Sequence, residues 1–169
     1  MTGTLVITLD FELAWGSFDI FRGDPRHLEA ARWTHEIGVP AIIAALEKAK
    51  LSATWAIVGA LAGDGLPTTT GFTEVSYPHY TQPWFDAVPR GVGEKEAPEW
   101  FAPSLVHRLR AATTHQEIAF HSFSHVLFDH PGTPRDRVEM TEKIRFSSRV
   151  QSSMQRAYLP FIGSSEAQR

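Results

Sequence analysis

The sequence predicts an α/β fold in which parallel strands alternate with helices. The chain has 169 residues, enough for one ordinary domain or two very small ones. Its residues are 43% apolar and 21% charged, a balance that allows a buried core. Within the first sixty residues, a strand-like run, a helical segment and a second strand-like run follow one another, which is the βαβ pattern.

The first three elements follow from their residue patterns. Residues 5–9 (LVITL) are apolar and β-branched on both faces, which predicts a buried strand of a parallel sheet. A helix is expected to open at residues 38–40 (GVP), with the proline near its first turn. Its apolar positions at helical spacing are Ile42, Ile43, Leu46 and Ala49. Residues 52–58 predict a second strand, which Gly59 ends.

Residues 63–103 differ in composition from the rest of the chain, with six prolines, five glycines and interleaved aromatic residues. This composition predicts a long ordered loop, inserted into the domain and rich in aromatic side chains and proline. Two interpretations are open: the loop carries recognition, or its aromatic side chains form a lid packed on the core.

The remaining elements are a helix, a strand and a second helix. Residues 103–112 predict a short helix with Leu105, Val106 and Leu109 facing inward, and residues 117–120 predict a third strand that ends at His121. A charged helix is expected from Arg135 to about residue 145. Residues 146–169 contain six serines and one acidic residue. We therefore expect one domain over residues 1–145 and an atypical tail over residues 146–169.

Composition argues against several functions. The absence of cysteine excludes disulfide scaffolds, thiolate zinc fingers, iron–sulfur clusters and cysteine nucleophiles. A net charge of −3 argues against a dedicated nucleic-acid binder. The first ten residues do not resemble a secretory signal, and no apolar run approaches the ~18 residues of a membrane span. These features predict a cytoplasmic protein.

Two short segments contain candidate site residues. In residues 8–12 (TLDFE), strand alternation places Asp10 and Glu12 on one side at the end of a predicted strand. In residues 121–125 (HSFSH), one helical turn would bring His121 and His125 to one face, a spacing that chelates metals.

Each segment also has an ordinary structural interpretation. The acidic pair could cap a helix or solvate a loop, and the histidines could be two half-exposed side chains on a turn. Because both segments directly follow predicted parallel strands, they are expected at the same end of the sheet. Two imidazoles and a carboxylate would then form a divalent-metal site.

In this order, the motifs resemble those of polysaccharide deacetylases of the NodB-homology type (carbohydrate esterase family 4). Residues 8–12 look like the family's first motif and residues 121–125 like its second. Residues 38–40 and 53–59 (ATWAIVG), together with the strand before His121, are similar to the segments between them. The likeness extends over about residues 5–145. It implies a partial or distorted (β/α) barrel and the removal of acetyl groups from an N- or O-acetylated sugar of a polysaccharide.

The resemblance also implies roles for individual residues. Asp10 corresponds to the catalytic base, and Glu12, His121 and His125 correspond to the metal ligands; a swap of roles between Asp10 and Glu12 stays open. The family's common form has adjacent aspartates, whereas Phe11 separates the two acids here. Zinc suits this ligand set, and cobalt, nickel and iron accept the same donors. Trp15 either forms a wall for the substrate or is a core aromatic residue.

The family's later motifs, including the histidine that serves as general acid, have no counterpart in this chain. The alternative is therefore a truncated or catalytically inactive sugar-binding fragment that keeps the metal pocket. A metal-dependent hydrolase of a non-sugar substrate is a third interpretation. The sequence leaves oligomerisation open.

Overall fold

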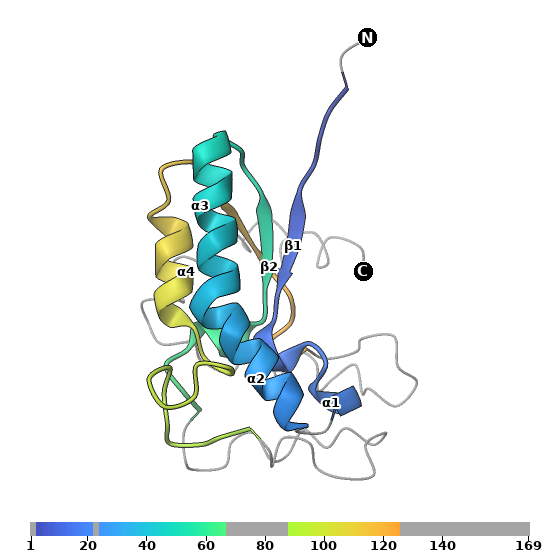
Figure 1. The fold of residues 1–169 in the computed structure, drawn as a ribbon, viewed down its shortest axis with the longest axis vertical. Helices are drawn as coiled ribbons and strands as arrows, with labels where there is room; N and C mark the ends of the chain where they lie inside the picture. Colours follow the sequence, from blue (N-terminus) through green and yellow to red (C-terminus); the bar gives the residue numbers. More distant parts are fainter. Residues whose placement is uncertain (1–2, 22–23, 67–87, 126–169) are drawn as a thin grey trace, which may run out of the picture.

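The computed structural model describes residues 3–21, 24–66 and 88–125. Within them, three parallel strands form a sheet in chain order: β1 (Thr8–Phe11), β2 (Thr54–Ile57) and β3 (Glu117–Phe120). Helices connect the strands and cover one face of the sheet (Figure 1). The third strand has the predicted bounds. Closure of the sheet into a barrel stays a prediction.

The three parallel strands lie side by side, and their carboxyl ends are level with one another. Phe11 at the end of β1 is level with Ile57 at the end of β2, which is level with Phe120 at the end of β3. The residues that follow β1 and β3, Glu12 and His121, therefore leave the sheet at the same edge. This register supplies the basis of the candidate site.

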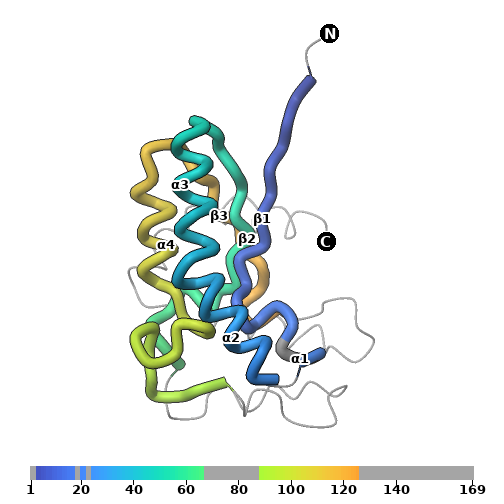
Figure 2. Tube along the Cα trace, viewed as in Figure 1, coloured from blue at the N-terminus to red at the C-terminus, as the bar shows by residue number. Residues whose placement is uncertain are grey.

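The first strand begins and ends later than the predicted residues 5–9. Leu5 and Val6 are 77% and 73% exposed, and they belong to a segment that projects beyond the sheet (Figures 1 and 2). The prediction of a strand buried on both faces is wrong for these residues. Because β2 begins at Thr54, opposite Thr8, no described strand lies alongside the segment before Ile7.

A helical run longer than predicted connects β1 to β2. It follows a short 3₁₀ turn, η1 (Leu13–Trp15), and one helical turn, α1 (Phe18–Phe21). The run comprises α2 (Pro25–Trp33), a π-helical turn η2 (Thr34–Gly38) and α3 (Val39–Ala49). Its start has ordinary signals, since the Asp24 side chain accepts a hydrogen bond from the Arg26 N–H and Pro25 occupies the first turn.

Pro40 lies inside this run and does not mark its beginning. A proline has no N–H for the carbonyl four residues earlier, and its ring crowds that carbonyl. Just before Pro40, the Val39 N–H bonds to the Thr34 carbonyl, five residues back, which is the wide turn of η2. This turn accommodates the proline, and α2 leans away from the axis of α3 there (Figure 1).

The helices bury narrow apolar stripes. In α3, Val39, Ile43 and Leu46 are buried, whereas Ile42 and Ala49, which the sequence places on the inner face, are exposed. Adjacent helical positions are about 100° apart, so Ile42 cannot share a narrow stripe with Ile43. The helix α4 (Pro103–Arg110) buries the three residues predicted to face inward, Leu105, Val106 and Leu109.

Aromatic side chains dominate the core between the sheet and the helices. The largest fully buried ones are Trp15, Trp55, Trp100 and Phe101. Trp100 and Phe101 belong to the predicted insertion over residues 63–103, so its final part packs in the core, in keeping with the packed interpretation. Residues 67–87, the predicted helix near residues 135–145 and the tail 146–169 lie outside the described residues.

Candidate metal site

Three side chains from distant parts of the sequence meet at the carboxyl ends of the strands. The Oε1 atom of Glu12 lies 2.7 Å from His121 Nε2 and 3.1 Å from His125 Nε2. The two imidazole rings lie side by side, with centroids 5.2 Å apart. The structure therefore brings together the carboxylate and the two histidines that the sequence predicts as metal ligands.

The loop that carries the histidines is held against the loop after β2. The His121 N–H bonds to the Ile57 carbonyl, continuing the ladder by one residue. Gly59 N–H then donates to the Ser122 carbonyl and Ala60 N–H to the Phe123 carbonyl. Residues 121–125 form a turn and not the helical turn that the sequence predicts. The two rings nevertheless lie next to each other and close to the Glu12 carboxylate.

The backbone around the cluster adopts unusual conformations. Leu13, Ser122 and His125 have φ values of 49°, 54° and 57°, a region that residues other than glycine seldom occupy. In the described part of the chain, the one other non-glycine residue of this kind is Lys50, at the end of α3. Backbone strain of this kind is often found at functional sites.

The charges of the cluster favour ionised Glu12. A hydrogen bond with His125 lowers the pKa of Glu12 below its ordinary value of 4.5, and the charges of His125 and His121 act in the same direction. Partial burial opposes them by disfavouring the charged form. The net effect keeps Glu12 a carboxylate at neutral pH, the state in which it can bind a cation.

The three residues fit a divalent cation in donor type and spacing. One donor atom of each lies within 4.8 Å of one donor atom of the other two, and no other such group occurs among the described residues. Ligand atoms about 2.0–2.2 Å from a tetrahedral zinc ion lie about 3.4 Å from one another. Small shifts of the three side chains from their present distances would therefore make room for a cation. The side chains are 34% (His121), 22% (His125) and 22% (Glu12) exposed, which leaves the cluster accessible from solvent.

Asp10, the predicted base, is not part of this cluster. It is an exposed residue of β1, and its carboxylate does not belong to the group of mutually close donor atoms. Strand alternation predicts Asp10 and Glu12 on the same side, but the strand ends at Phe11. Glu12 itself has a strand-like φ of −124°, and its ψ of −29° takes the chain out of strand geometry only after this residue. That the two side chains share one side of the strand stays a prediction.

Trp15, which the resemblance leaves as a substrate wall or a core residue, lies in the core. Its side chain is 1% exposed, and its Nε1–H donates to the Trp100 carbonyl at 2.8 Å. The Trp15 and Trp100 rings meet edge to face, with centroids 5.3 Å apart. A ring this buried has no surface for a ligand, so the expectation of a substrate wall is corrected here.

Sequence reasoning missed Gly16, which contacts the candidate ligand Glu12. A Cβ atom built on Gly16 would lie 1.8 Å from Glu12 Oε2. The available sequence signal is a glycine four positions after an acidic residue, which by itself predicts nothing so specific.

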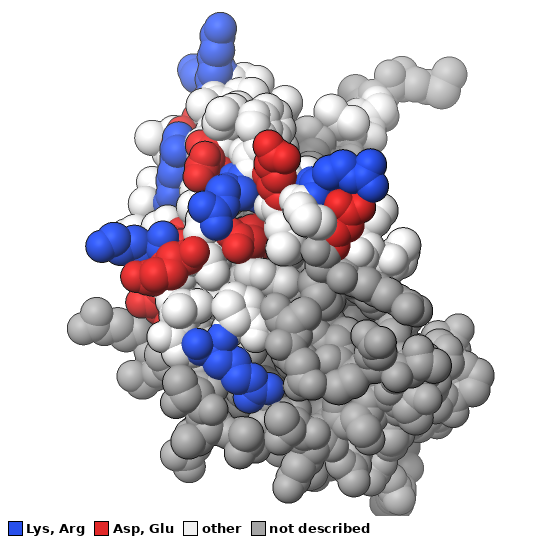
Figure 3. Space-filling model, turned by 60° about the horizontal axis from the view of Figure 1, so that its bottom comes forward, with Lys and Arg blue, Asp and Glu red and all other residues white. Residues whose placement is uncertain are grey.

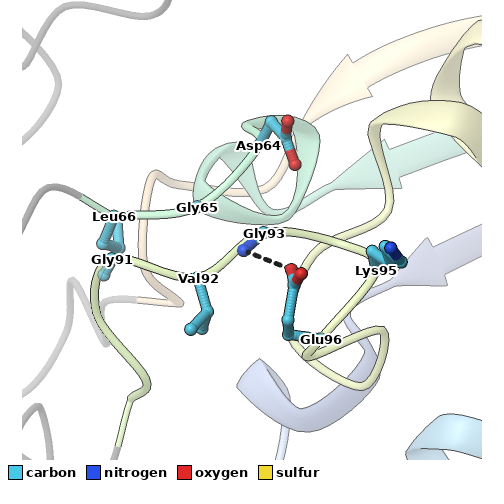
Figure 4. Close-up of a pocket in the computed structure, with 8 residues that line it drawn as sticks. All are labelled: Asp64, Gly65, Leu66, Gly91, Val92, Gly93, Lys95 and Glu96. Atoms are coloured by element: carbon cyan, nitrogen blue, oxygen red, sulfur yellow. Dashed lines mark hydrogen bonds between the residues drawn. The ribbon is translucent and has the colours of Figure 1, made fainter.

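A separate hollow of about 700 Å³ lies between the two described ends of the insertion (Figure 4). Its lining residues are Asp64, Gly65, Leu66, Gly91, Val92, Gly93, Lys95 and Glu96. Gly65 has a φ of +96° and a Cβ there would lie 2.2 Å from the Val92 carbonyl oxygen, so this close approach requires glycine. None of the predicted site residues lines the hollow.

On the face shown in Figure 3, basic and acidic side chains are interspersed. Within the part of the chain that the structure describes, no helix is both long and apolar enough to cross a membrane.

Comparisons with known proteins identify no relative of this chain. No family model matches the chain, and the searches of curated proteins and of solved structures find no match. The meeting of Glu12, His121 and His125 is therefore the main observation on which a functional conclusion can rest.

Proposed function

We propose that this chain is a metal-dependent hydrolase that removes acetyl groups from acetylated sugars. The observation that carries the proposal is the meeting of Glu12, His121 and His125 at the carboxyl ends of parallel strands. Binding sites of α/β sheets are commonly built at this edge. The substrate class rests on the order of the two motifs and their resemblance to polysaccharide deacetylases.

In this proposal the three residues of the cluster hold one divalent cation, with zinc favoured by the nitrogen and oxygen donors. A cation bound there would supply Lewis acidity and a more acidic water. Glu12 contributes a negative charge because its pKa is lowered, and each histidine contributes Nε2. Asp10, two residues before Glu12 and exposed on β1, is the proposed general base.

A second candidate function is a metal-holding, sugar-binding module without turnover. The observation that favours it is the position of Asp10, whose carboxylate lies outside the group formed by the three ligands. A general base must come within hydrogen-bond reach of the proton that it takes, although such contacts often tighten only when substrate binds. A hydrolase acting on a non-sugar substrate would use the same ligands.

Metal binding and turnover can be tested separately. We expect the purified wild-type chain to bind zinc in a calorimetric titration and to release acetate from N- or O-acetylated oligosaccharides. Glu12→Ala and His125→Ala should weaken zinc binding because each removes a ligand. Asp10→Asn should keep zinc binding and lose acetate release by roughly 10²- to 10⁴-fold, the usual contribution of a general base.

Asp64→Asn, a carboxylate change outside the cluster, is the matched control and should leave zinc binding unchanged. Absence of zinc binding by the wild type would remove the chemical basis of both candidates. Zinc binding without acetate release would favour the second candidate, and acetate release that survives Asp10→Asn would reject Asp10 as the base. Release of acetate from non-sugar esters or amides alone would reject the sugar substrate class.

A further inference from the structure

We infer that Gly16 is a positioning residue for the candidate metal site, because its bare Cα forms the surface on which the Glu12 carboxylate rests. The inference depends on the proposed role of Glu12 as a metal ligand. It assigns to Gly16 the task of fixing where that ligand lies.

The contact between the two residues leaves no room for a side chain at position 16. A Cβ atom on Gly16 would lie 1.8 Å from Glu12 Oε2, 2.7 Å from Cδ and 2.9 Å from Cβ. The backbone of Gly16 has φ −65° and ψ −31°, a conformation that any residue adopts. The requirement for glycine is therefore one of space and not of backbone freedom.

The backbone beneath Glu12 is anchored and cannot easily give way. Its neighbour Trp15 is buried, and the Trp15 Nε1–H bonds to the Trp100 carbonyl at 2.8 Å. The Ala14 N–H bonds to the Glu99 carbonyl at 3.0 Å, and the Trp15 N–H bonds to the Glu12 carbonyl at 3.0 Å. The Glu12 carboxylate, by contrast, is at the end of a rotatable, partly exposed side chain. An added methyl group at position 16 would therefore displace mainly the carboxylate, while the longer 2.9 Å contact with Glu12 Cβ would need a small adjustment of the backbone.

Displacement of the carboxylate would break the cluster. Glu12 Oε1 is the atom that lies close to both His121 Nε2 and His125 Nε2. Metal sites require ligand distances within about 0.2 Å of their ordinary values. Residues that orient metal ligands typically change metal affinity by roughly 10- to 100-fold when they are altered. We expect a loss of this size for Gly16→Ala.

The test compares Gly16→Ala with Gly63→Ala in the full chain, using zinc as the probe. At Gly63 the atom nearest to an added Cβ would be the Ala60 carbonyl oxygen, at an ordinary 3.5 Å. Zinc affinity is measured by competition with a chelator, and thermal unfolding is measured on the metal-free proteins. Gly16→Ala should lower zinc affinity by roughly 10- to 100-fold with little change in melting temperature. Gly63→Ala should leave the affinity unchanged.

A double variant establishes whether Gly16 acts through Glu12. In the Glu12→Ala background, Gly16→Ala should cause no further loss of affinity, because the displaced group is already absent. If Gly16→Ala lowers the melting temperature, the loss should be smaller in the Glu12→Ala background, where only the contact with the Cβ of residue 12 remains. An equal loss in both backgrounds would overturn the inference.

The outcomes separate this inference from the proposed function. Equal zinc affinity in the wild type and Gly16→Ala would overturn the positioning role and leave the proposed site standing. A wild-type chain that binds no zinc would overturn both.

Discussion

At the scale of single residues, the candidate site depends most on Glu12. One oxygen of its carboxylate lies within 3.1 Å of both histidines, and a hydrogen bond with His125 is the main cause of its lowered pKa. Partial burial raises the pKa but does not cancel the effect of the histidines. Glu12 thus enters the cluster as an anion, which is the form that binds metals.

This lowered pKa has a consequence for acid stability. A carboxyl group whose pKa is lower in the folded chain stabilises the fold above its ordinary pKa, here 4.5, and the contribution is lost as pH falls through the lowered value. We therefore expect Glu12→Gln to lose part of the acid dependence of stability. Urea unfolding of the metal-free proteins at several pH values below 4.5 measures this, and the free energies of the two proteins should converge as pH falls. A gap that stays constant over this range would contradict the expectation.

Residue-scale features were only partly predictable from the sequence. The meeting of Glu12 with His121 and His125 follows from a general rule, because residues after parallel strands emerge at one edge of a sheet. The contact of Gly16 with Glu12 depends on a 3₁₀ turn with positive φ at Leu13. The conformational preferences of these residues do not predict a turn with positive φ at Leu13. That the Asp10 carboxylate lies outside the cluster could not be predicted from alternation, which gives the side of a strand and not a distance.

At the scale of elements, helix boundaries were harder to predict than helix interiors. Pro40 favours a helix start, but the π-helical turn before it allows the helical run to begin at Pro25. The cap formed by Asp24 is an ordinary start signal, and it lies in a stretch without a clear apolar stripe. In α4, where the apolar stripe is clear, the predicted inward residues are the buried ones.

The end of α3 provides a stability prediction. Lys50 terminates this helix in the left-handed conformation, with φ 55° and ψ 40°, where a side chain costs about 1 kcal/mol relative to glycine. We expect Lys50→Gly to raise the free energy of unfolding by about 1 kcal/mol. Urea unfolding at neutral pH measures the change.

Lys48→Gly is the matched control, because it makes the same substitution two residues earlier in the same helix. Lys48 lies within α3, where glycine is less favourable than other residues by up to about 1 kcal/mol. This control should lower the free energy of unfolding, whereas Lys50→Gly should raise it. Changes of the same sign in both variants would show that the left-handed cap does not determine the result.

At the scale of the whole molecule, Glu99 and Trp100, in the final part of the predicted insertion, anchor the backbone next to the candidate site. The Glu99 and Trp100 carbonyls accept hydrogen bonds from Ala14 and Trp15, directly beside Glu12. The sequence predicts neither pairing, since the partners are 85 positions apart and both tryptophans could belong to any part of a core. The composition distinguishes residues 63–103 from the rest of the chain, but it could not show what their final part packs against.

This support can be tested at Trp15. We expect Trp15→Phe to lower the free energy of unfolding by about 1–3 kcal/mol, because it removes the donor to the Trp100 carbonyl. It should also weaken zinc binding, because the backbone under Glu12 loses an anchor. Chemical unfolding of the metal-free protein and a zinc titration measure the two effects.

Leu109→Ala is the control for general destabilisation. Leu109 is buried in α4, and its truncation should cost about 2–5 kcal/mol while leaving zinc affinity unchanged. Loss of zinc binding in both variants alike would indicate that lowered stability, and not the anchor, weakens the site.

Glu12 and His125 are in contact although 113 positions separate them along the chain. An unfolded chain does not hold such distant groups together, so an ion that needs both recognises only native molecules. Each tenfold rise in the free ion above its dissociation constant then favours the native form by about 1.4 kcal/mol through mass action. If the chain holds the ion that we propose, the supply of this ion would therefore change the fraction of chains that are folded.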